Sequence, residues 1–208
     1  SRATELISSG FTPVQTPDVR LVAAIKGLRR GSTAPEQLDV THLFHRPMSG
    51  GDLYVFDLED GSGDSITVTN GVVAIVDPLL KLPRLALVPA PGGSEAMTGS
   101  AIMRLVGDVM NRALAQRGLS RVTLADDGGL GKRYLIVAED AAAAGAVLPQ
   151  ERCAELASLE STYAMEAEGD LLMVSQAPAY VQPATARPPL WQVLDDARRI
   201  HAILKRTS

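Results

Sequence analysis

Hydrophobic positions near the start of the chain follow a helical period: Leu21, Val22, Ile25 and Leu28. This spacing predicts an amphipathic helix that ends at Gly31. The segment Thr16-Pro17-Asp18 can begin it, because threonine caps helices, proline suits the first helical position and aspartate faces the positive end of the dipole. Arg29 and Arg30 are then interpreted as residues that complement the dipole at the other end. A shorter helix is predicted from Thr4 to Gly10.

Between Leu38 and Pro89 the hydrophobic pattern becomes that of β-strands. Segments 40–46 and 52–58 flank Met48-Ser-Gly-Gly51, and this arrangement predicts a β-hairpin. Segment 65–69 follows after a second tight turn, segment 72–76 is expected to continue that strand past a kink at Asn70-Gly71, and segment 84–88 is a further short strand. Consecutive strands joined in this way are expected to pair antiparallel.

The second half alternates helical and strand-like segments. It is predicted to contain a long helix from about Ser100 to Arg117, strands at 121–125 and 133–138, short helices at 141–144 and 150–159, a hairpin over 162–174, and a helix from Leu190 to about Lys205. We therefore predict an α+β fold with antiparallel strands in two groups separated by the long helix, and a packed C-terminal helix. The chain forms either two domains, residues 1–95 and 96–208, or one compact unit.

Composition excludes several classes of function. The 208 residues are 46% hydrophobic and 21% charged, with a net charge of −4 and only 4% aromatic residues. Such a chain has neither the basic surface nor the stacking residues of a nucleic-acid-binding protein. Its single cysteine, Cys153, allows no internal disulfide or thiolate metal site and suits a buried helical position. No apolar run has the length of a membrane-spanning helix.

Two histidines near one aspartate are the candidates for catalysis. His42 and His45 are three residues apart on a predicted strand and should face opposite sides of the sheet, so a shared metal site would need a bulge. Asp57 lies on the next strand. The third histidine, His201, lies on the apolar stripe of the last helix, where a packed core histidine is expected.

Acidic residues around Gly61 and Gly63 do not fit a calcium loop. In an EF-hand register with Gly61 sixth, the first and third ligands would be Phe56 and Leu58. We therefore expect Asp57, Glu59, Asp60 and Asp64 to form a solvated acidic turn. Another acid, Asp140, is expected to cap the alanine run that follows it, which leaves Glu139-Asp140 with a structural role.

Two further motifs fail to match known chemistry. The segment Gly128–Lys132 lacks the first glycine and the final serine or threonine of a phosphate-binding loop. No serine lies in a Gly-x-Ser-x-Gly elbow, and the loop serines Ser49 and Ser94 have no assigned base. We predict no cofactor, no metal site and no assembled catalytic group.

Three segments carry a resemblance to a known group of proteins: Ser9 to Pro13, Leu82 to Pro89, and Arg133 to Asp140 followed by Leu148 and Glu168 to Leu172. Together they resemble an uncharacterised bacterial family of membrane-anchored proteins whose soluble domain has no assigned function. The resemblance implies an anchor upstream of Ser1 and a soluble domain at the cytoplasmic face of the membrane. It supplies no catalytic residues.

These observations favour a non-enzymatic binding or protein-interaction module at a bacterial membrane, with a protein or a small ligand as its partner. The alternative is a small hydrolase that uses His42, His45, Asp57 or a loop serine. A pocket where one of the histidines meets Asp57 or a serine would favour the hydrolase. A large exposed apolar patch would favour the module.

Overall fold

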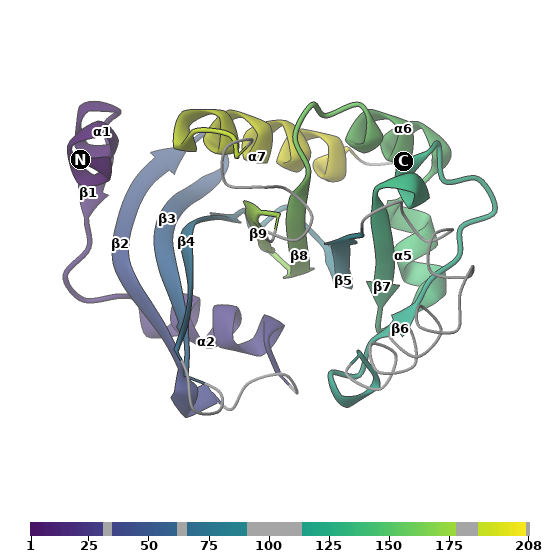
Figure 1. Cartoon of the computed structure of the whole chain (residues 1–208), viewed down its shortest axis with the longest axis horizontal. Helices are drawn as coiled ribbons and strands as arrows, with labels where there is room; N and C mark the ends of the chain where they lie inside the picture. The colour runs from purple at the N-terminus through teal and green to yellow at the C-terminus, as the bar shows by residue number, and fades with distance from the viewer. Residues whose placement is uncertain (31–34, 62–65, 91–113, 178–186, 207–208) are drawn as a thin grey trace.

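One antiparallel β-sheet organises the molecule (Figure 1). The computed structural model describes residues 1–30, 35–61, 66–90, 114–177 and 187–206. In these ranges nine strands pair in the order β1-β2-β3-β4-β9-β8-β5-β7-β6. They are β1 (Thr12–Pro13), β2 (Leu38–Met48), β3 (Gly51–Asp60), β4 (Thr67–Val76), β5 (Leu82–Pro89), β6 (Ser120–Arg121), β7 (Tyr134–Ala138), β8 (Tyr163–Gly169) and β9 (Leu171–Gln176).

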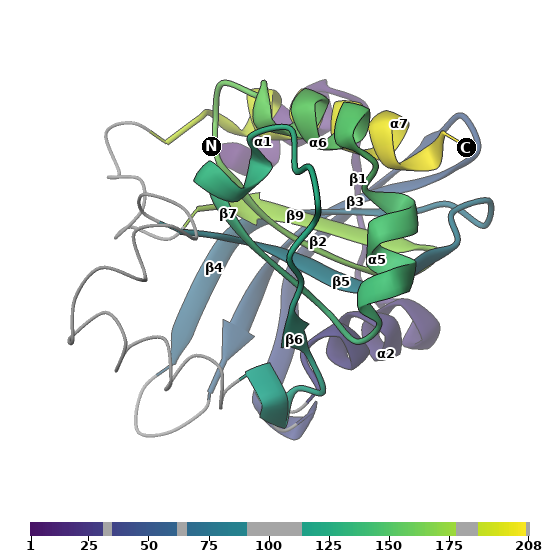
Figure 2. The same ribbon diagram turned by 90° about the vertical axis from the view of Figure 1, so that its right-hand side faces the viewer.

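Helices cover both faces of this sheet (Figure 2). The described helices are α1 (Arg2–Ser8), α2 (Val19–Leu28), α5 (Ala141–Val147), α6 (Gln150–Ala157) and α7 (Leu190–Lys205), with short 3₁₀ turns at Pro35–Gln37 and Leu130–Lys132. Helices α6 and α7 lie on one side of the sheet and α2 lies on the other (Figures 1 and 2).

Strand β4 shows how the sheet fills both cores. Val73 and Ile75 pack in the cluster that includes the apolar side of α7, whereas Val72 and Ala74 pack in the cluster that includes α2. Successive side chains point to opposite faces of a strand, and here both faces are covered. The run Val72–Ile75 is therefore apolar without alternation, and all four residues are fully buried.

The structure confirms the α+β class and the antiparallel sheet. The hairpin of β2 and β3 turns between Met48 and Gly51 as predicted, and α7 has the predicted bounds. Most of the predicted helix from Ser100 to Arg117 lies outside the described residues, so the division of strands into two groups is not confirmed. Strands from 1–95 and from 96–208 share the sheet, because β4 pairs with β9, and β5 pairs with β7 and β8.

Two local predictions need correction. The N-cap of α2 is Asp18 and not Thr16, because the Asp18 carboxylate accepts hydrogen bonds from the amides of Arg20 (2.6 Å) and Leu21 (3.3 Å). The strand predicted at 121–125 is reduced to β6, Ser120–Arg121. It pairs with the end of β7, and after Val122, whose amide donates to the Ile136 carbonyl (2.9 Å), the chain turns towards the bend that contains Asp126.

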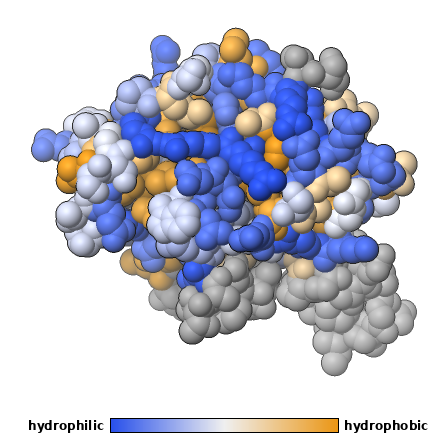
Figure 3. Space-filling view, turned by 90° about the horizontal axis from the view of Figure 1, so that it is seen from above, coloured by the Kyte–Doolittle hydropathy of each residue, from blue (hydrophilic) through white to orange (hydrophobic). Residues whose placement is uncertain are grey.

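The large exposed apolar side chains of the described residues come from several separate elements. Large exposed hydrophobic residues occur on α1, α2, the start of β4, the loop after β4 and the start of α7: Ile7, Val19, Ile66, Val68, Leu79 and Trp191. On the face that carries α7 and α6, hydrophilic and hydrophobic residues are interspersed (Figure 3). Ile66 and Val68 stand out because they lie two residues apart in sequence.

A buried carboxylate attaches α7 to the sheet. Asp77 follows β4 and is fully buried. It accepts hydrogen bonds from His201 Nε2 (2.8 Å) and from the Leu79 amide (2.9 Å), and Lys205 Nζ lies 2.7 Å away. His201 is buried in the apolar side of α7, as expected, but its ring has a charged partner that the helical pattern did not predict. Burial alone would raise the pKa of Asp77, but the hydrogen bonds from Lys205, Leu79 and His201 lower it to about 2.

We expect Asp77→Asn to reduce the free energy of unfolding by about 2 kcal/mol at neutral pH. Because the folded-state pKa of Asp77 lies below its ordinary value, this stabilisation is present above the unfolded pKa and is lost as the pH falls towards about 2. Urea unfolding of wild type and variant should therefore give a difference that narrows between about pH 5 and pH 2. Asp195→Asn, at an exposed ion pair, should change stability by less than about 0.5 kcal/mol. A difference for Asp77→Asn that is constant with pH would contradict the assignment.

Candidate functional site

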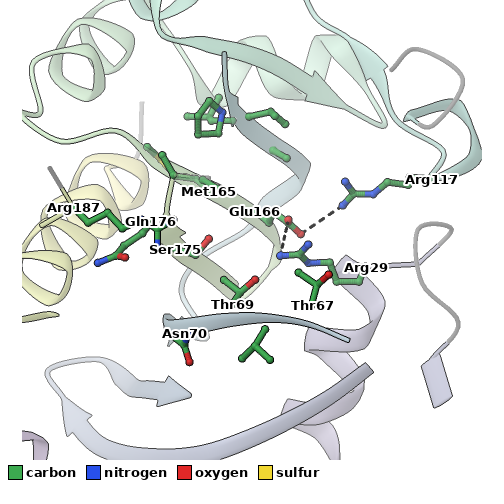
Figure 4. A pocket seen from close by; sticks show the side chains of 17 residues that line it. Arg29, Thr67, Thr69, Asn70, Arg117, Met165, Glu166, Ser175, Gln176 and Arg187 are labelled. Carbon is green, nitrogen blue, oxygen red and sulfur yellow. Dashed lines mark ion pairs between the residues drawn. The ribbon is translucent and has the colours of Figure 1, made fainter. Parts of the chain in front are cut away.

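A pocket of about 460 Å³ opens where β4 separates from β8 and β5 (Figure 4). Its walls are residues 67–70 of β4, 86–89 of β5, 164–166 of β8, and 175–177 at the end of β9. The separation arises because β9 pairs with β4 only over Val73–Val76 and ends at Gln176. Beyond that point the two sides of the sheet diverge, and this opening is the pocket.

Three arginines and one carboxylate surround the pocket. Arg29 is the C-cap of α2, Arg117 follows the helical turn at 114–116, and Arg187 precedes α7. Glu166 of β8 lies between the first two: Arg29 Nη2 is 3.2 Å from Oε1, and Arg117 Nη2 is 3.5 Å from Oε2. Arg187 lies at the opposite end, beside Gln176 (Figure 4). The lining therefore carries an excess of positive charge in a chain whose net charge is −4.

The ion pairs at Glu166 are mostly withdrawn from solvent. The side chains of Arg117 and Glu166 are 15% and 14% exposed. Burial lowers the pKa of Arg117, Glu166 opposes that shift, and the charge of Arg29 lowers the pKa further. Within the described ranges, Arg117 Nε and Glu166 Oε2 are buried without a hydrogen-bond partner. The polar groups of this cluster thus leave hydrogen-bonding capacity unused at the edge of the pocket.

Arg84 binds the backbone segments that carry Arg29 and Arg117. It is buried, and it donates to the carbonyls of Arg117 (2.6 Å) and Arg30 (3.2 Å). Arg117 in turn donates to the Leu28 carbonyl at 3.2 Å. These contacts satisfy carbonyls at the C-terminal end of α2 and at the turn before β6, where a helix has no partners of its own. Arg84 is thus committed to holding the backbone.

The interpretation of Arg29 and Arg30 as residues that only complement the helix dipole is incomplete. Arg30 does donate to the Gly27 carbonyl at 3.1 Å. It also pairs with Glu168 (2.9 Å) and Glu139 (3.2 Å), as Arg29 pairs with Glu166. Glu166 and Glu168 are two residues apart on β8 and therefore share one face of the strand. The end of α2 lies against that face, so both arginines reach across to it.

The predicted candidates for catalysis lie elsewhere. His42 Nδ1 is 3.1 Å from Asp57 Oδ2, whereas His45 Nε2 is 2.7 Å from Asp52 Oδ1. A bulge between Thr41 and Phe44 does occur, and His42 has a positive φ of 50°. The two histidines nevertheless contact different carboxylates, and neither lines the pocket.

Asp57 is already saturated by structural partners. Arg2 donates to both of its oxygens at 2.6 Å, and the Gly71 amide donates at 2.8 Å. Burial raises the pKa of Asp57, but the hydrogen bonds from Arg2, Gly71 and His42 and the charge of Arg2 bring it below its ordinary value. This carboxylate joins α1, β2 and β4 to β3 and has little capacity left to activate a base.

The remaining motifs have structural roles wherever the structure describes them. Asp140 caps α5, as predicted, by accepting from the amides of Ala142 (2.8 Å) and Ala143 (3.0 Å). In segment 128–132, Asp127 accepts from the amides of Gly129 and Gly131, so these donors are already used. Cys153 is buried as predicted, and burial raises its pKa to about 11.

The expectation of a solvated acidic turn is wrong for Asp57, which lies on β3 and is buried. Glu59 accepts from Thr41 at 2.9 Å, and Asp64 lies outside the described residues. Among the residues that are described, no group of three His, Cys, Asp or Glu side chains could hold a metal ion. Ser49 is exposed at the hairpin turn, and Ser94 is not among the described residues.

No protein-family model matches this sequence, and comparison with curated proteins and with solved structures gives no match. None of the helices in the described ranges has the length and apolar character needed to cross a membrane.

The sequence pattern does not reveal the pocket, because its residues come from seven separate segments. One signal was present: Glu166 and Glu168 alternate with apolar residues on a strand, and a basic pair ends an earlier helix. Nothing in the sequence, however, places that helix end against that strand.

We expect Glu166→Gln to lower the free energy of unfolding by about 2 kcal/mol, because it leaves two largely buried arginines without their counter-charge. Urea unfolding at low ionic strength measures this loss. Glu160→Gln, a substitution at an exposed position, is the matched control and should change stability by less than about 0.5 kcal/mol. Equal stability of the two variants would show that the ion pairs at Glu166 contribute nothing.

Proposed function

We propose that this protein is a non-enzymatic binding module that takes an anionic ligand in the pocket between β4 and β8. The observation that carries the proposal is the lining itself, which includes three arginines, Arg29, Arg117 and Arg187, but only one carboxylate, Glu166. Guanidinium groups suit carboxylate and phosphate ligands because their N–H donors form a planar fork. A volume of about 460 Å³ lies in the range of small-ligand sites.

The ligand should carry apolar or hydrogen-bonding groups beside its charge. Besides the arginines, the pocket is lined by the exposed Val68 and by Thr69 and Gln176, which carry a hydroxyl and an amide group. A ligand held only by its charge would leave these groups in contact with water. We therefore expect an anion attached to a larger body, and simple ions should bind more weakly than the natural ligand.

The chemistry of the lining supports binding over catalysis at this position. Its described residues include no histidine, cysteine or aspartate, and its one carboxylate is held by two arginines. A general base needs a free lone pair within reach of the substrate. As part of the same proposal, the resemblance to membrane-anchored bacterial proteins supports a site of action at a membrane.

The test compares Arg187→Ala with Arg198→Ala, two arginines of which only the first lines the pocket. At about 10 mM, inorganic phosphate should raise the Tm of wild type by about 2–4 °C if its Kd is about 1 mM. Sodium chloride of equal ionic strength controls for screening. The rise should shrink in Arg187→Ala and persist in Arg198→Ala. No rise in wild type, or equal rises in all three proteins, would refute an anion site here.

A hydrolase is the second candidate, and the contact between His42 and Asp57 is the observation that favours it. We expect p-nitrophenyl acetate to be hydrolysed at equal rates by wild type, His42→Ala and His45→Ala, because Arg2 and Gly71 already saturate Asp57. Loss of a general base costs about a hundredfold or more. A loss of that size in His42→Ala alone would establish the hydrolase instead.

A further inference from the structure

One edge of β4 has no strand beside it in the part of the chain that the structure describes. On one side β4 pairs with β3 from Thr67 to Val76, apart from a bulge near Asn70. On the other side it pairs with β9 only from Val73 to Val76. Residues 67–70 therefore have a described strand neighbour on one side only.

This open edge borders the pocket. Thr67, Val68, Thr69 and Asn70 all line it. Successive side chains of a strand point to opposite faces, so a pocket over one face would contact only alternate residues. Contact with all of residues 67–70 indicates that the pocket runs along the edge of β4, where backbone N–H and C=O groups are presented.

The edge also lacks the usual protection against strand pairing. Exposed edges commonly carry lysine, proline or inward-pointing charges that prevent another chain from adding to the sheet. Residues 67–70 include none of these, and Thr67, Val68 and Thr69 are β-branched residues that favour strands. Val68 and the preceding Ile66 are exposed hydrophobic residues at the same place.

Positive charge lies at both ends of this edge. Thr67 lies towards Arg29 and Arg117, whereas Asn70 lies towards Arg187 (Figure 4). Four residues of extended chain span about 13 Å. An extended segment with an acidic group near each end would match the edge in length and the arginines in charge.

We propose that the pocket receives an extended acidic peptide, which pairs with residues 67–70 of β4 as an added strand. This inference rests on the proposed function, because the peptide supplies the anion. Main-chain hydrogen bonds to β4 give affinity, and the acidic groups that meet the arginines give selectivity. A peptide meets both demands of the site, whereas a small anion would use only the arginines.

The probe is a fluorescein-labelled peptide, Asp-Val-Thr-Val-Thr-Asp, whose binding is followed by fluorescence anisotropy. The alternate amides of the peptide form two sets, one along each edge of the extended chain. One derivative is N-methylated on the first set and another on the second set. A third derivative has lysine in place of both aspartates. Because only one edge of the peptide can face β4, methylation of one set should weaken binding by about tenfold or more, and methylation of the other should not. The lysine peptide should also bind with an affinity that is lower by about tenfold or more.

Variants of the protein locate the site. Val68→Asp places a carboxylate on the edge of β4 and should weaken binding of the aspartate peptide by about tenfold. Val19→Asp, at an exposed position on α2, is the matched control and should bind as wild type does. Arg187→Ala and its control Arg198→Ala form a second pair, which tests the site without a substitution in β4. Amides within 67–70 should gain protection from hydrogen exchange when the peptide binds.

The outcomes separate this inference from the function on which it rests. If phosphate stabilises the protein through Arg187 but the peptide fails to bind at millimolar concentration, strand addition is wrong and the anion pocket stands. The same holds if both methylated peptides bind as well as the parent. If Arg187→Ala changes neither the rise in Tm that phosphate causes nor the affinity for the peptide, both proposals fail.

Discussion

The pairing of β4 with β9 holds the two sides of the sheet together. It spans only Val73–Val76 opposite Leu171–Val174, but both faces of these strands are buried, against α7 on one side and α2 on the other. Because β9 ends at Gln176 while β4 extends back to Thr67, the same pairing that closes the sheet also leaves an opening. The pocket is thus a consequence of unequal strand lengths, and the side chains around it determine what it can bind.

Local patterns predicted much of the fold and little of the site. The helix at Leu190–Lys205 and the hairpin of β2 and β3 depend on periodicity and turn residues close in sequence, and both formed as predicted. The positive φ of His42 arises from a bulge against β3, and the pairing of β4 with β9 joins segments about a hundred residues apart. Such contacts depend on the tertiary arrangement, which hydrophobic periodicity does not encode.

The histidine and carboxylate pairs show why residue type alone misled the search for chemistry. His42 with Asp57 and His201 with Asp77 both have the composition of a catalytic pair. In each, the carboxylate also binds a cation and a backbone amide: Arg2 and Gly71 at Asp57, Lys205 and Leu79 at Asp77. A carboxylate held in this way joins elements of the fold, and its pKa falls because the native contacts stabilise its charge.

The arginines differ in how far the fold already uses them, and this difference separates a ligand site from a structural cluster. Arg84 is buried and donates to two backbone carbonyls. Arg117 divides its donors between the Leu28 carbonyl and Glu166 and leaves Nε without a partner in the described structure. Arg187 is exposed, and no hydrogen bond or ion pair joins it to another described residue. Like Arg117 Nε, Arg84 Nε is buried without a hydrogen-bond partner in the described structure, so Arg84 and Arg117 differ from Arg187 in exposure. Of these three arginines, Arg187 is the one whose guanidinium a ligand can reach without displacing a contact to another described residue.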